Sequence, residues 1–187
     1  MLGTDELKPD NELYLGAFEK SGLRDVKLPS TLKRIEHRVF TGCKNLKVVS
    51  FPERLEYLGK FCFLQSGLES VDFPASLRTI SQGSFSQCKN LRSAKFAEGP
   101  EALGTDERQR DGTMWSGAFQ ESALESVRLP STLRKIAYRT FAGCRSLKAI
   151  ELPDRLECIG KYCFSESGLE SIKTPSALRT IDAWAFY

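Results

Sequence analysis

The feature that most constrains this chain is a phenylalanine that returns every 22 or 23 residues. One interval departs from this period, because 34 residues separate Phe85 from Phe119. A fixed period in this range is typical of a solenoid, in which stacked turns of the chain, or rungs, bury one continuous core. The repeated residues are Phe18, Phe40, Phe63, Phe85, Phe119, Phe141, Phe164 and Phe186.

The other apolar residues repeat in step with phenylalanine, in the pattern L-x-x-V-x-L-P-x-x-L-x-x-I-x-x-x-x-F that Leu23 to Phe40 shows. The L-x-x-V-x-L part alternates at its end, which predicts a short strand whose valine points inward. Proline lacks an N–H and therefore ends the strand. The L-x-x-I part fits either a second extended segment or a tight turn. The residues before phenylalanine fit one turn of 3-10 or α-helix.

Two longer periods lie above the single rung. The step from phenylalanine to the next leucine is five residues after Phe18 and six after Phe40, so that two rungs form a unit of 45 residues (63 − 18). Equivalent positions in the two halves differ by 101 (119 − 18). We therefore expect one domain over residues 1–187 with about eight rungs, and an internal duplication of 2–86 and 103–187.

The long interval contains an insertion that has a counterpart near the start of the chain. Insertions in solenoids form loops on one face, so we expect loops at residues 4–14 and 105–115. Each ends in an aromatic residue, Tyr14 or Trp115. Aromatic residues on loops often anchor a partner, which makes both candidate binding residues. The alternative is that each ring folds back over its own rung.

The pattern resembles the leucine-rich repeats of the BspA-like family, L-x-x-I-x-I-P-x-x-V-x-x-I-G-x-x-A-F-x-x-C. Residues 46–62 and 147–163 carry it, with Gly59 and Gly160 at the family's glycine position. The resemblance implies a repeat solenoid of the β-rich α/β class. Its expected form is a right-handed leucine-rich-repeat superhelix, with a parallel β-sheet on the concave face and short turns or 3-10 helices elsewhere. It also implies an adhesion-like binding role at the cell surface or in secretion.

In such a superhelix the residues that flank the inward valines point to solvent. One flanking column is rich in small residues and the other carries charges of both signs, which suits a protein or glycan ligand. The alternative is a solvated sheet face without a ligand. The candidate binding residues are Asp25, Lys27, Ser50, Ser70, Asp72, Lys95, Ser126, Arg128, Glu151 and Lys173.

Composition argues against several other functions. The net charge is +3, from 27 basic and 24 acidic residues, and the uniform basic charge with interleaved aromatic residues that nucleic acid needs is missing. The sequence contains no apolar run of about 18 residues, so we expect no membrane insertion. The single histidine, His37, has no acid–base constellation around it, and no nucleophile elbow or phosphate-binding loop occurs. We therefore expect no catalysis and no cofactor.

The six cysteines fit structural free thiols better than disulfides or a metal site. Cys43, Cys88 and Cys144 occupy the same repeat position. Cys43 and Cys88 lie two rungs apart, roughly 10 Å, beyond the reach of about 7 Å for a disulfide. A C-x-x-C motif is missing, which argues against zinc. Free thiols fit a reducing interior and the start of the chain is not a signal sequence, so the compartment stays open.

These observations predict a non-catalytic scaffold that binds a protein or a glycan. The alternative is a structural subunit of a larger assembly with no ligand of its own. Met1 aligns with Ala102 inside a rung, and the last phenylalanine precedes only Tyr187. Because solenoids usually carry polar caps, we expect partner contacts to cover both ends.

Overall fold

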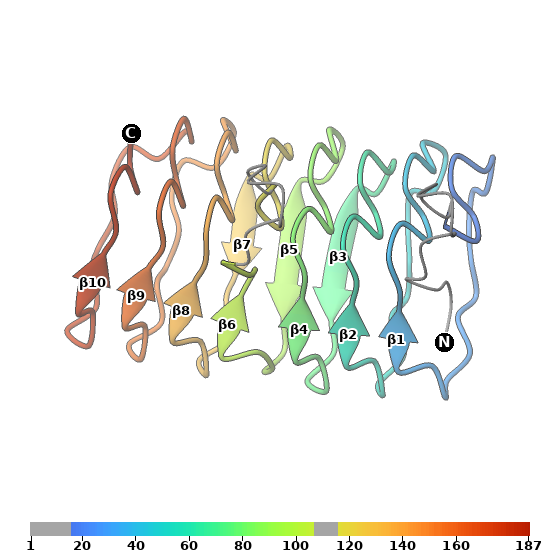
Figure 1. The fold of residues 1–187 in the computed structure, drawn as a ribbon, viewed down its shortest axis with the longest axis horizontal. Coiled ribbons are helices and arrows are strands. Elements are labelled where there is room, and N and C mark those ends of the chain that lie inside the picture. The colour runs from blue at the N-terminus through green and yellow to red at the C-terminus, as the bar shows by residue number, and fades with distance from the viewer. Residues whose placement is uncertain (1–15, 107–115) are drawn as a thin grey trace, which may run out of the picture.

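The computed structural model describes residues 16–106 and 116–187. Tyr14, Trp115, the loop expected at 4–14 and most of the loop expected at 105–115 lie outside these ranges. The described chain stacks in successive rungs along one long axis, from the blue end to the red end of Figure 1. Its short strands all pair in parallel with strands of neighbouring rungs. This arrangement confirms the predicted solenoid.

The L-x-x-I segments form the most regular strands, which settles the choice between an extended segment and a turn. Each contributes two residues, and Ile35 for example lies opposite Leu58. The row at the front of Figure 1 consists of two sheets. They contain β1 (Arg34–Ile35), β2 (Tyr57–Leu58) and β4 (Thr79–Ile80), then β6 (Ala102–Leu103), β8 (Lys135–Ile136), β9 (Cys158–Ile159) and β10 (Thr180–Ile181).

The L-x-x-V-x-L segments pair as strands only in three central rungs, whereas the sequence predicts a strand in each rung. These strands are β3 (Ser70–Phe73), β5 (Ser93–Phe96) and β7 (Ser126–Arg128), which run behind the front row and in the opposite direction (Figure 1). The rings of Phe73 and Phe96 stack with their centroids 4.4 Å apart, which holds these rungs close. Leu129 occupies this position in the rung of β7, whereas Phe51, in a rung that forms no strand, also stacks on Phe73 at 5.6 Å. Ring stacking therefore does not decide alone which rungs pair.

The repeated phenylalanines form a continuous stack through the middle of the solenoid. Neighbouring ring centroids are 5.1–5.7 Å apart and the ring planes lie within 14° of each other. Phe40, Phe63, Phe85, Phe119 and Phe141 have no exposed surface. The stack crosses the long interval without a break, since Phe85 and Phe119 lie 5.2 Å apart. The insertion therefore leaves the core in register.

The residues around each phenylalanine form turns, and no helix occurs in residues 16–106 or 116–187. Of the expected short turns or 3-10 helices, the structure therefore has the turns, and the expected turn of helix before phenylalanine does not form. In most rungs the residues two positions before and after phenylalanine have left-handed backbone angles, as at Arg38 (φ 60°) and Gly42 (φ 69°). The N–H groups of Arg38, Phe40 and Gly42 donate to carbonyl oxygens of the next rung at 2.7–3.0 Å. In a helix these N–H groups would donate to carbonyl oxygens of the same segment, along the helix axis, and not to the next rung.

All six cysteines are free thiols, as predicted, and three of them form hydrogen bonds between consecutive rungs. The Cys43 thiol donates to the Phe18 carbonyl oxygen at 3.0 Å and lies 3.3 Å from the Ser21 hydroxyl. Cys88 and Cys144 repeat this arrangement with Ser66 and Ser122. Serine and cysteine thus alternate at one position of successive rungs, which gives a physical reason for the two-rung period.

Candidate functional site

The ten binding residues predicted on the strand face lie in two columns along the β3–β5–β7 side of the solenoid, and all ten are exposed. Ser70, Ser93 and Ser126 stand opposite one another in the strand register, next to the row Asp72, Lys95 and Arg128. Between the columns, the Val71 and Ala94 side chains point inward and are 2% and 1% exposed. We call the predicted residues, together with Val48, Ser93, Ala149 and Ser171 in the small-residue column, the strip.

Two shallow hollows interrupt the strip where strand pairing is missing. One, of about 1130 Å³, contains Asp25, Lys27 and Ser50 in its lining. The other, of about 860 Å³, contains Ser126, Arg128 and Glu151. The lining residues of the second hollow are equivalent to those of the first, because their sequence numbers are higher by 101. The same depression therefore recurs in both halves of the sequence. A partner that follows the strip would therefore meet a raised central sheet with a hollow on each side.

A ladder of charges with alternating sign borders the strip. We call it the strip-side ladder. Its neighbours form ion pairs between Lys47 and Glu69 (3.0 Å) and between Lys148 and Glu170 (3.3 Å), and Arg92 pairs with Glu125. Because each charge has a partner on the next rung, the ladder favours the correct stacking order. Its members are Lys47, Glu69, Arg92, Glu125, Lys148 and Glu170.

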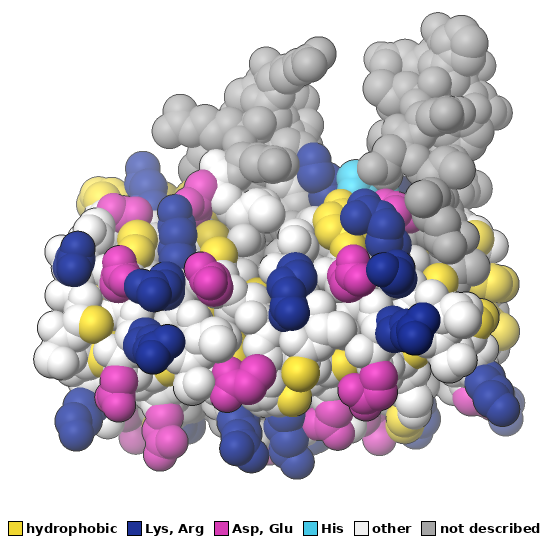
Figure 2. Space-filling model, turned by 90° about the horizontal axis from the view of Figure 1, so that it is seen from below, with side chains coloured by type: hydrophobic (Ala, Val, Ile, Leu, Met, Phe, Trp, Pro, Cys, Tyr) yellow, Lys and Arg dark blue, Asp and Glu magenta, His cyan; other side chains and the backbone are white. Residues whose placement is uncertain are grey.

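A second ladder occupies the turns that precede the front row of strands. We call it the turn ladder. Lys33 pairs with Glu56 at 3.0 Å, and Arg134 lies between Glu101 and Glu157 and pairs with both. Figure 2, the view from below Figure 1, shows cationic and acidic side chains interspersed over this face. The members of the turn ladder are Lys33, Glu56, Arg78, Glu101, Arg134, Glu157 and Arg179.

The charges of the strip differ from those of the strip-side ladder, each of which forms an ion pair. No strip residue forms an ion pair within the described part of the chain. The strip also contains Val48, whose side chain is 58% exposed. The charged residues in question are Asp25, Lys27, Asp72, Lys95, Arg128, Glu151 and Lys173. They are therefore available to a partner without the loss of an internal contact.

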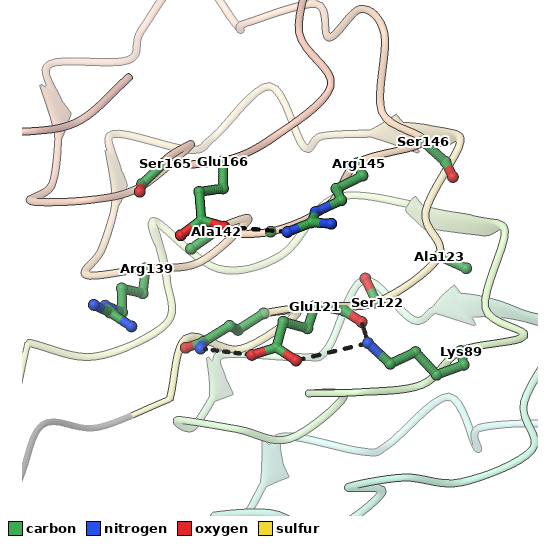
Figure 3. Close-up of a pocket in the computed structure, with 12 residues that line it drawn as sticks. Lys89, Glu121, Ser122, Ala123, Arg139, Ala142, Arg145, Ser146, Ser165 and Glu166 are labelled. Carbon is green, nitrogen blue, oxygen red and sulfur yellow. Dashed lines mark hydrogen bonds and ion pairs between the residues drawn. The ribbon is translucent and has the colours of Figure 1, made fainter. Parts of the chain in front are cut away.

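A separate hollow of about 460 Å³ lies among the turns around Phe119, Phe141 and Phe164 (Figure 3). Two ion pairs cross it, Lys89–Glu121 at 3.6 Å and Arg145–Glu166 at 3.3 Å. Arg139 lies apart from both pairs in Figure 3. Sequence reasoning missed this hollow, because its residues come from turns that carry no recognisable motif.

The described residues offer little chemistry for catalysis or metal binding. Burial raises the pKa of the Cys88 and Cys144 thiols to about 11, so neither is a nucleophile at neutral pH. Burial likewise raises the pKa of Cys62 and Cys163. Within residues 16–106 and 116–187, no cluster of histidine, cysteine and carboxylate side chains could hold a metal ion. The same residues contain no helix long and apolar enough to cross a membrane.

Stacked parallel rungs around a phenylalanine core, with an exposed strand face, define a leucine-rich-repeat solenoid. The sequence matches the BspA type Leucine rich repeat region in six copies, over residues 11–106 and 113–187. The chain therefore belongs to the BspA-type leucine-rich repeat family, as the sequence pattern predicts.

Solved structures show the same fold. A leucine-rich repeat protein from Bacteroides ovatus ATCC 8483 is 25% identical, with a TM-score of 0.74 over 87% of this chain and 40% of that chain. A leucine rich cell surface protein from Faecalibacterium prausnitzii A2-165 is 22% identical, with a TM-score of 0.51 over 81% of this chain and 48% of that chain. The chain thus spans less than half of either structure. No curated protein matches it.

Proposed function

We propose that this chain is a non-catalytic scaffold that binds a partner protein through the strip. The observation that carries the proposal is the contrast between the unpaired charges of the strip and the strip-side ladder beside it, in which every charge is paired. A solenoid that only filled space would gain from pairing all of them, even though each exposed pair contributes only about 0–1 kcal/mol. Solvated charges in fixed register instead provide steering and specificity for a partner.

The shape of the strip favours a protein over a nucleic acid. Asp72 lies beside Lys95, and Lys95 lies beside Arg128 in the strand register, so that charges of both signs stand next to a column of small side chains. A polyanion would be repelled by Asp72 and by Glu151. A folded protein surface of mixed charge can match both signs, and the exposed Val48 side chain adds an apolar contact. A location at the cell surface, as the family resemblance implies, is part of this proposal.

Site-specific photo-crosslinking tests the assignment. A photoreactive residue is placed at Ser70 or Ser126 on the strip, and at Ala75 as a control, because Ala75 is small and exposed but lies in a turn. We expect one partner protein from the source cells to cross-link from both strip positions and not from Ala75. Equal cross-linking from all three positions would instead favour the structural subunit, which contacts neighbours on every side.

A further inference from the structure

The internal duplication supplies a comparison between two arginines at equivalent positions, Arg38 and Arg139 (139 − 38 = 101). In the first half, Arg38 forms a two-point ion pair with Glu19. Its Nε donates to Oε2 at 3.1 Å and its Nη2 donates to Oε1 at 2.6 Å. The Glu19 side chain is 2% exposed, and the hydrogen bond from Arg38 lowers the pKa of its carboxyl.

In the second half, the residue equivalent to Glu19 is Gln120 (19 + 101). Its Oε1 accepts a hydrogen bond from the Gly117 N–H at 3.1 Å, just as Glu19 Oε2 accepts from Gly16 at 3.2 Å. Its other atom is an amide nitrogen, which donates to Glu121 at 3.4 Å and cannot accept from an arginine. The exchange of carboxylate for amide therefore keeps the turn and removes the partner of Arg139.

Among residues 16–106 and 116–187, the Arg139 guanidinium has no replacement for this partner. Its Nε is buried and makes no hydrogen bond, while its Cζ lies 5.1 Å from the ring centre of Tyr162 and 5.6 Å from that of Tyr138. These ring contacts satisfy the charge but leave the N–H donor in the guanidinium plane without an acceptor. A buried donor without an acceptor destabilises the folded chain, and an incoming carboxylate would remove this cost.

We propose that Arg139 and the hollow beside it bind the carboxylate of a sugar acid. The Gln120 amide lines this hollow at the place of the Glu19 carboxylate, so the ligand carboxylate displaces that amide and binds Arg139 in the two-point geometry that arginine favours. The hollow of about 460 Å³ falls within the range of small-ligand sites. Its mixed donors and acceptors, Lys89, Glu121, Arg145 and Glu166, suit sugar hydroxyl groups.

The charge of the lining distinguishes a sugar acid from an acidic peptide. Three cations, Lys89, Arg139 and Arg145, face two carboxylates, Glu121 and Glu166, which leaves a single net positive charge. One carboxylate on a neutral, hydroxylated ring matches this balance. A run of acidic side chains would meet Glu121 and Glu166 and be repelled.

The test uses NMR of the arginine Nε–H groups during titration with glucuronate, with glucose as the neutral control and a tetrapeptide of glutamates as the peptide probe. We expect the Arg139 signal, assigned by its loss in Arg139→Lys, to shift saturably with glucuronate only. The Gln120→Glu variant fills the site from within and should weaken glucuronate binding at least about tenfold. The converse variant Glu19→Gln frees Arg38 and should create a second responding signal.

Several outcomes would overturn the proposal. These are an Arg139 signal that glucuronate leaves unmoved, equal glucuronate affinity in the protein and in Gln120→Glu, and a response to the glutamate tetrapeptide alone. Because Gln120→Glu reproduces a pair that the first half already contains, a folded variant is expected. Unchanged circular dichroism of each variant shows that altered binding does not reflect unfolding.

Discussion

Replacement of Phe141 with alanine removes one ring from the middle of the phenylalanine stack. Phe141 has no exposed surface and stacks on Phe119 at 5.7 Å and on Phe164 at 5.5 Å. Burial of the side chain contributes about 1.5–3 kcal/mol, and each stacked pair adds about 0.5–1.5 kcal/mol. The sum agrees with the loss of about 3–5 kcal/mol that such truncations usually cause.

The last ring of the stack provides a matched control. Phe186 is 43% exposed and stacks on Phe164 alone, so Phe186→Ala should cost about 1–2 kcal/mol by the same reasoning. Urea denaturation followed by far-UV circular dichroism measures both losses in the 187-residue chain. A loss below about 1 kcal/mol for Phe141→Ala, or equal losses for the two variants, would refute the role assigned to the stack.

Three further predictions concern the thiols, the turns and the ladders. Burial raises the pKa of Cys88 and Cys144 from 9.0 to about 11. The contribution of each buried thiol to the free energy of unfolding should therefore be fully present below pH 9. Between pH 9 and pH 11 the free energy of unfolding should fall by about 1.4 kcal/mol per pH unit for each thiol. A pH series of urea midpoints checks this, and a constant midpoint would contradict it. Gly67→Ala brings a Cβ within 2.0 Å of the Lys44 carbonyl oxygen, whereas Gly22 in the same type of turn meets nothing within 4 Å. Thermal melts should therefore show a loss of about 2–4 kcal/mol for Gly67→Ala and less than about 0.5 kcal/mol for Gly22→Ala; similar losses would argue against close packing of these turns. Glu157→Lys places three cations in succession on the turn ladder and should lower stability by about 1 kcal/mol at low salt, with recovery in 1 M NaCl; a loss independent of salt would point to packing instead.

The sequence predicts the core of this solenoid because rungs of equal length place equivalent residues next to each other. The Phe18 to Phe186 stack and the inward Val71 follow directly from the period. The sequence could not decide whether the L-x-x-I segments form a strand or a tight turn, since two residues such as Arg34 and Ile35 are too few to show a period. The helical turn was predicted wrongly because left-handed angles at Arg38 and Tyr162 (φ 57°) occur at residues that normally avoid them.

The candidate site could be predicted only in part. Exposure of the strip follows from the position of its residues beside the inward valines, and the structure bears out that exposure. Its role in binding stays a prediction, as do the roles of Tyr14 and Trp115, which lie outside the described residues. The alternating signs of the ladders were readable from the sequence once the rungs were aligned. The unpaired Nε of Arg139 could not be predicted from the sequence, because it depends on atomic distances between adjacent rungs.

The most direct test of the strip is the affinity of the cross-linked partner for a variant with reversed charges, Asp72→Lys, Lys95→Glu and Arg128→Glu. Because none of these side chains forms an ion pair among the described residues, stability should stay within about 0.5 kcal/mol. We expect this variant to bind the partner at least about tenfold more weakly, since the complementary charges then repel. An unchanged affinity in the folded variant would contradict the assignment of the strip as the binding surface.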